Sequence, residues 1–188
     1  MTVILGVDPG LTRMGVGIIK QGRGRGVSLL HVETLRTPAG TEVSSRIGSL
    51  SDALAKILDE FAPDVVALER VFAQHNVSTV MGTAHISGVV LALAHERSIP
   101  VSLRTPSEVK AAVTGYGRAS KGQVGALVAK ILGLAEVPQP ADAADALALA
   151  ITEAWRGQPP QESASPLTPA QKAWRDAEQK AKRPKLTR

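Results

Sequence analysis

The chain has 188 residues, of which 44% are apolar, and it contains no cysteine. This length corresponds to one domain and a tail, and the absence of cysteine excludes a disulfide framework and thiolate metal sites. The N-terminus lacks the basic stretch of a signal peptide, and no apolar run approaches the roughly 20 residues of a membrane span. We therefore expect a soluble, cytoplasmic protein with no membrane partner.

The net charge of +5 is concentrated at the C-terminal end. Residues 157–188 contain seven basic and three acidic side chains, whereas residues 1–156 contain 15 basic and 14 acidic ones. The end segment is also rich in Pro, Ser and Gln, a composition typical of disorder. The sequence predicts a folded domain over residues 1–156 and a basic, disordered tail over residues 157–188. The tail either adds nonspecific DNA affinity or serves as a solubilising appendage, and the sequence does not decide between these roles.

Strand and helix patterns follow one another along the predicted domain. Three strand-like segments come first, at 3–7, 14–20 and 27–36, and a helix is expected over 44–61. The later elements are a buried strand at 64–69, a long helix at 76–96, a short strand at 101–103, and helices near 105, 121–132 and 142–155. This order predicts an α/β fold with one mixed five-stranded sheet, antiparallel in its first three strands and flanked by helices.

Two acidic residues directly follow buried strands. Asp8 comes directly after the first apolar run, and Glu69 comes directly after the run Val65 to Leu68. Taken alone, Asp8 in an Asp-Pro-Gly turn is ordinary turn chemistry, and Glu69 is an acid paired with a nearby base. Strand ends in α/β sheets are, however, where ligands usually bind. If the two strands are neighbours, these carboxylates meet.

Two further acids open the last predicted helix. Asp142 and Asp145 are three residues apart and lie on one helical face. Acids near a helix N-terminus are often simple capping residues, yet the residues between and around these two are almost all Ala and Leu. Clustered carboxylates repel unless they share a cation, and carboxylates suit Mg²⁺ or Mn²⁺. Two such ions about 3.5–4 Å apart stabilise the attacking and leaving oxygens of a phosphodiester.

The four acids belong to three motifs that occur in a specific order. The segments GVDPGLTRMGVG at 6–17, LERVF at 68–72 and DAADALA at 142–148 resemble motifs of the RuvC family of Holliday-junction resolvases in order and spacing. Actin-like kinases open with a similar first motif, but the three motifs together are highly specific. The resemblance covers about residues 2–156 and excludes the tail.

This resemblance implies an RNase H-like fold, a homodimer, and DNA phosphodiester hydrolysis with two Mg²⁺ ions per active site, which Mn²⁺ can replace. The family's catalytic, metal-binding acids carry over to Asp8, Glu69, Asp142 and Asp145. The implied reaction is paired nicking of two like-polarity strands of a four-way DNA junction in recombination and repair. It leaves 5′-phosphate and 3′-hydroxyl ends, and the implied partner is the RuvA–RuvB branch-migration complex.

Other residues are candidates for DNA binding. Phe72, just beyond Glu69, is either a core residue or a stacking platform for an unpaired base, and the resemblance favours stacking. Basic side chains are either solvated or in contact with phosphates, and the resemblance favours contact for Lys110 and Lys121, with Arg118 and Arg13 as further candidates. The long helix at 76–96 carries small residues, such as Ala84 and Gly88, and is our candidate dimer interface.

Three alternative functions remain open at this point. An actin-like kinase shares the first motif, but it needs a second domain for which the chain is too short. An RNase H-like nuclease acting on structured RNA has the same acids. A junction-binding scaffold without catalysis is the third alternative, and the four retained acids argue against it.

Overall fold

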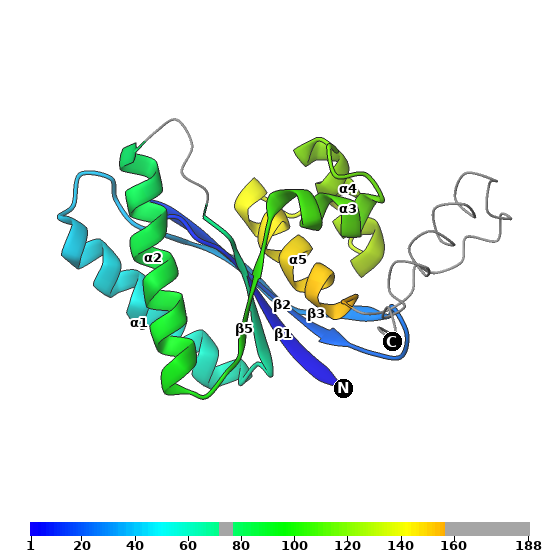
Figure 1. Cartoon of the computed structure of the whole chain (residues 1–188), viewed down its shortest axis with the longest axis horizontal. Helices are drawn as coiled ribbons and strands as arrows, with labels where there is room; N and C mark the ends of the chain where they lie inside the picture. Colours follow the sequence, from blue (N-terminus) through cyan, green and yellow to red (C-terminus); the bar gives the residue numbers. More distant parts are fainter. Residues whose placement is uncertain (72–76, 157–188) are drawn as a thin grey trace, which may run out of the picture. The chain divides into compact units, whose positions relative to one another are not determined.

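The computed structural model describes residues 1–71 and 77–156, which form one mixed sheet with helices on both faces (Figure 1). The elements follow in the order β1 (Thr2–Asp8), β2 (Arg13–Gln21), β3 (Val27–Arg36), α1 (Val43–Phe61), β4 (Val65–Glu69), α2 (Val77–Glu96), β5 (Val101–Arg104), α3 (Pro106–Thr114), α4 (Lys121–Leu132) and α5 (Ala141–Ala154). The predicted α/β class and five-stranded sheet are confirmed, with element ends shifted by one or two residues. The predicted tail lies outside the described residues. Within the described ranges, no helix is long and apolar enough to cross a membrane.

The strand order β3-β2-β1-β4-β5 makes β1 the central strand of the sheet. Strand β1 pairs antiparallel with β2, which places Asp8 opposite Gly15. It pairs in parallel with β4, where Val7 stands beside Leu68. Asp8 and Glu69 are the next residues along these two strands. Both acids therefore end their strands at the same edge and project from the same face of the sheet.

Alternation of side chains along the strands divides the core into two parts. On one face, Leu5, Val7 and Val16 belong to a cluster with apolar residues of α1 and α2. On the other face, Ile4 and Ile19 belong to a cluster with apolar residues of α3, α4 and α5. Figure 1 shows these two groups of helices on opposite sides of the strands. Because side chains alternate with a period of two, Asp8 shares the α5 face with Ile4.

Helix α5 lies very close to the sheet because three glycines face it. A Cβ atom at Gly6 would lie 2.0 Å from the carbonyl oxygen of Ala146, and one at Gly15 would lie 2.0 Å from that of Asp142. At Gly17 a Cβ would lie 2.8 Å from a methyl group of Leu147. A side chain at any of these positions would push the helix away. Gly15, which stands opposite Asp8, therefore leaves the space that the first turn of α5 occupies.

One basic side chain is buried between the turn after β1 and the loop after β3. Arg46 on α1 is only 8% exposed. Its Nε donates a hydrogen bond to Thr37 Oγ1 at 3.0 Å, and its Nη2 donates to Thr12 Oγ1 at 2.7 Å. The hydroxyl of Thr37 in turn donates to the carbonyl oxygen of Leu11 at 2.5 Å. Arg46 therefore fixes the turn that follows Asp8.

Replacing this arginine is expected to destabilise the fold. Arg46→Met keeps most of the side-chain volume but removes two charge-assisted hydrogen bonds, worth about 1.5–3 kcal/mol each. We expect the free energy of unfolding to fall by about 2–4 kcal/mol and the melting temperature to fall by roughly 4–16 °C. Thermal unfolding followed by circular dichroism measures this. Lys56→Met, at an exposed position of the same helix, is the control and should change the melting temperature little. Equal melting temperatures for the two variants would contradict the anchoring role.

Candidate active site

The acids at the ends of β1 and β4 meet, as the parallel pairing of these strands requires. The carboxyl groups of Asp8 and Glu69 lie close enough to be joined by a hydrogen bond when one of them is protonated. The pKa of Asp8 is raised from 3.8 to about 8, first by burial and then by the negative charges of Glu69 and Asp145. Burial also raises the pKa of Glu69, and the charge of Asp145 adds to this effect. Three of the four predicted acids therefore act on one another electrostatically.

The two acids of α5 approach this pair from the facing helix. The N-cap of α5 is Pro140, which makes no side-chain cap hydrogen bond, so the interpretation of Asp142 as a capping residue is wrong. The negative charge of Asp145 contributes to the raised pKa values of both Asp8 and Glu69. The carboxylate of Asp142 instead contacts Arg13, with 3.2 Å between Oδ2 and Nε. The structure thus brings all four acids to one face of the sheet, three of them as a cluster and Asp142 beside it.

Two of the predicted DNA-binding residues contact these acids directly. The ammonium group of Lys121 donates a hydrogen bond to Asp145 Oδ2 at 2.7 Å, and this bond raises the pKa of Lys121. Arg13 contacts Asp142 as described above. The basic side chains are 74% exposed for Lys121 and 54% exposed for Arg13, whereas their acidic partners are 25% and 21% exposed. The acids are therefore held at the site, and the bases extend from it into solvent.

The remaining predicted DNA-binding residues have other surroundings. Lys110 is partly buried on α3, and Arg118 is exposed in the loop before α4. Both precede α4 in the chain, and Lys121 is the first residue of that helix. Phe72 lies outside the described residues, so its role in base stacking stays a prediction.

The chemistry of these residues fits a hard divalent cation. All four ligand candidates are carboxylates, and a cation among Asp8, Glu69 and Asp145 would relieve the repulsion that adds to burial in raising the first two pKa values. Asp142 Oδ2 is buried and accepts no well-formed hydrogen bond in the described part of the chain, although Arg13 lies nearby.

The described residues contain no group of three acidic or His side chains already arranged around a common point. The carboxylates of Asp142 and Asp145 are directed at Arg13 and Lys121 instead. A metal ion held by these two carboxylates together with Asp8 and Glu69 would compete with Arg13 and Lys121 for their Oδ2 oxygens.

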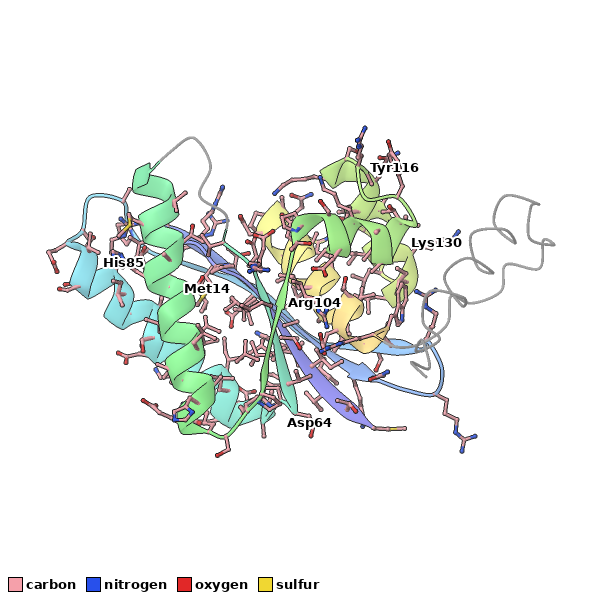
Figure 2. All side chains as sticks on the ribbon, in the orientation of Figure 1. Met14, Asp64, His85, Arg104, Tyr116 and Lys130 are labelled. Carbon is pink, nitrogen blue, oxygen red and sulfur yellow. The ribbon has the colours of Figure 1, made fainter. Side chains whose placement is uncertain are left out.

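A second set of contacts, which the sequence pattern did not reveal, holds the C-terminal half of α5. Arg104 of β5 pairs with Glu153, and Figure 2 shows Arg104 between β5 and α5. The Nε atom of Arg104 lies 2.9 Å from Glu153 Oε2, and Ser102 Oγ donates to Glu153 Oε1 at 3.2 Å. The indole of Trp155 donates to the carbonyl oxygen of Arg25 at 2.9 Å. With glycine contacts at one end and these bonds at the other, α5 is a rigid support for its acids.

A mixed sheet with acids at the ends of two adjacent central strands, covered by an acid-bearing helix, is the arrangement of an RNase H-like nuclease. A family model described as "Crossover junction endodeoxyribonuclease RuvC" matches residues 4–153. The chain belongs to the RuvC family.

Similar proteins agree with this assignment over nearly the whole chain. The crossover junction endodeoxyribonuclease RuvC of Leifsonia xyli is 51% identical, covering 97% of this chain and 95% of that protein. The one of Paenarthrobacter aurescens is 55% identical, covering 96% and 97% respectively. The solved structure of T. thermophilus RuvC in complex with a Holliday junction substrate matches with a TM-score of 0.79 and 34% identity, covering 84% of this chain and 96% of that one.

Proposed function

We propose that this chain is a nuclease that resolves Holliday junctions in recombination and repair by paired nicking of two strands of like polarity. The observation that carries the proposal is that Asp8, Glu69 and Asp145, from three separate elements, lie close enough to act on one another through their charges, in a member of the RuvC family. The products would be ligatable 5′-phosphate and 3′-hydroxyl ends. The relative from T. thermophilus has been solved with a Holliday junction substrate, which supports this choice of substrate.

The carboxylates of Asp8, Glu69, Asp142 and Asp145 would hold two Mg²⁺ ions, with Mn²⁺ as a substitute. When bound, these ions supply activation of the attacking water and stabilisation of the leaving 3′-oxygen. Asp8 must be ionised to act as a ligand, so its raised pKa makes metal binding compete with a proton. The strand ends and the rigid α5 keep the backbone that carries the carboxylates in place, so binding requires only side chains to reorient.

The four basic residues predicted to bind DNA would hold its backbone. Lys110 lies on α3, and Arg118 lies in the loop before α4. Lys121 is the first residue of α4, and Arg13 is the first residue of β2. Such side chains usually contact phosphates and set the position of the strand without reading its sequence. Phe72 would stack on an unpaired base near the junction centre.

A homodimer would place two such sites on two symmetry-related strands. The outer side of α2 supports this, because Met81 is 49% exposed and Leu91 is 43% exposed, and the small residues Ala84 and Gly88 are exposed on the same helix. The opposite side of α2 packs on the sheet through Ile86 and other buried residues. The further proposed partner is the RuvA–RuvB branch-migration complex, in the cytoplasm.

Incubation of an end-labelled four-way DNA junction with the full chain and Mg²⁺ tests the proposal. The expected products are symmetric nicks on two opposite strands, with no cutting of a linear duplex of the same sequence. Products that ligase reseals would confirm the chemistry of the ends. Cleavage of structured RNA but not of the junction would favour the RNA nuclease alternative. Tight junction binding without nicks would favour the scaffold.

A further inference from the structure

Each acid of α5 is paired with a basic side chain from another element. Lys121, the first residue of α4, bonds Asp145 at 2.7 Å, and Arg13, the first residue of β2, lies 3.2 Å from Asp142. The two pairs are built alike, because in each a mostly buried carboxylate meets a long side chain that is more than half exposed. The basic groups thus neutralise the α5 acids from the solvent side.

The same four side chains have conflicting tasks in the proposed reaction. The carboxylates are needed as metal ligands, and the basic groups are needed as phosphate contacts. The two tasks compete while the pairs persist, since the Oδ2 oxygen that each carboxylate offers to its ammonium or guanidinium partner is shielded from a metal ion. Metal and DNA therefore both favour the opening of these pairs.

We propose that Lys121 and Arg13 are exchangeable counter-ions, which leave Asp145 and Asp142 for DNA phosphates as metal ions take their place. The proposal rests on the proposed function, because it takes the acids as metal ligands and the bases as phosphate contacts. Its consequence is that metal binding and DNA binding are coupled. Metal ions at the acids release Lys121 and Arg13 for DNA, and DNA phosphates draw these two side chains away from the acids. By thermodynamic linkage, each ligand strengthens the binding of the other by the same factor.

Lys121 carries the larger part of this coupling. Its positive charge acts on Asp8 and Glu69 as well as on Asp145, so its removal from the cluster affects three ligand candidates at once. The exchange is easy because Lys121 is 74% exposed, so that water weakens its ion pair and its long side chain reorients readily. An interaction of this strength corresponds to about a two- to fivefold change in a binding constant.

Two titrations of the full-length chain test the proposal. The first measures Mg²⁺ affinity by calorimetry without DNA, and the second measures the affinity for a four-way junction with nonhydrolysable phosphorothioate linkages at its centre, with EDTA or with Mg²⁺. We expect Lys121→Gln to bind Mg²⁺ about two- to fivefold more tightly than the unmodified chain when DNA is absent. We also expect Mg²⁺ to strengthen junction binding less in this variant, while Lys121→Arg retains the coupling.

Two lysine variants are matched controls for the loss of one positive charge. Lys130→Gln removes a charge from the last turn of the same helix, where Lys130 extends into solvent in Figure 2, and should change neither titration. Lys110→Gln should weaken junction binding but leave Mg²⁺ affinity without DNA unchanged.

Mg²⁺ affinity that is unchanged or weaker in Lys121→Gln would overturn the exchange and leave the nuclease assignment intact. A gain in Mg²⁺ affinity of equal size in Lys110→Gln would also overturn it, since general electrostatics would then explain the effect. Failure of the unmodified chain to bind Mg²⁺ at all would instead remove the proposed function, and the exchange with it.

Discussion

Asp8→Asn is expected to reduce junction nicking by at least about a thousandfold and, at the same time, to raise the stability of the metal-free chain. The loss of activity follows from removing a proposed metal ligand at the centre of the site. The gain in stability follows from the pKa of Asp8, which is raised from 3.8 to about 8 in the folded protein. Between these two values the folded chain holds a proton that the unfolded chain releases. Asp8 therefore costs stability increasingly as the pH rises through this window.

Melting temperatures measured in EDTA between pH 4 and pH 9 test both parts of this argument. The unmodified chain should lose stability steadily from about pH 4 to about pH 8, and Glu69, whose pKa is also raised, adds to the loss. Asp8→Asn should be less sensitive to pH, and at pH 8 we expect it to be more stable by at least ~1–2 kcal/mol, or roughly 2–8 °C. Near pH 4 the two proteins should melt together.

A matched variant separates this effect from a general loss of negative charge. Asp52→Asn removes an exposed carboxylate on α1 and should leave both the nicking rate and the pH profile of melting unchanged. If Asp8→Asn were no more stable than the unmodified chain at pH 8 in EDTA, burial and the neighbouring carboxylates would not raise the pKa of Asp8 as the structure indicates. Substantial nicking by Asp8→Asn would remove Asp8 from the metal site.

The strand-end acids were predictable because their strands are easy to recognise. Apolar runs directly before Asp8 and Glu69 indicate buried strands, and a carboxylate after such a run stands at the edge of a sheet. That these two strands are neighbours is a long-range property, which no local pattern contains. The motif resemblance supplied it, and the register of β1 with β4 confirms it. The periodicity of α5 likewise indicated one helical face for Asp142 and Asp145, but not which basic residues they meet.

The support of the site was less predictable, although parts of it leave a signal. A glycine within a strand indicates that another backbone approaches closely, and Gly6, Gly15 and Gly17 have this role. The sequence around these glycines does not show that the approaching element is α5. Arg46 falls in line with the buried Leu50 on the apolar face of α1, and a basic residue in such a position indicates buried hydrogen bonds. Its acceptors lie in two loops, whose conformation the sequence does not determine.

Gly15→Ala is expected to impair catalysis more than its effect on stability explains. The added Cβ would lie 2.0 Å from the carbonyl oxygen of Asp142 and 3.3 Å from the Cβ of Ala146. A backbone carbonyl within a helix cannot rotate away, so the first turn of α5 must move outward from β2. Overpacking of this kind costs about 1–3 kcal/mol of stability. A displacement of about 1 Å at reacting groups costs roughly a hundredfold in rate, and here the displaced turn carries Asp142.

Single-turnover nicking at a temperature well below the melting transition measures the catalytic part by itself. Gly17→Ala is the matched variant, because its Cβ would meet Leu147 further along α5, with a comparable cost in stability and a smaller displacement of the acids. Gly48→Ala, on an exposed part of α1 with open space around it, should keep full activity and gain about 0.5–1 kcal/mol. If Gly15→Ala and Gly17→Ala lose activity equally, the rate depends on the general packing of α5. A much larger loss at Gly15 would instead show that the distance between β2 and the first turn of α5 sets the geometry of the acids.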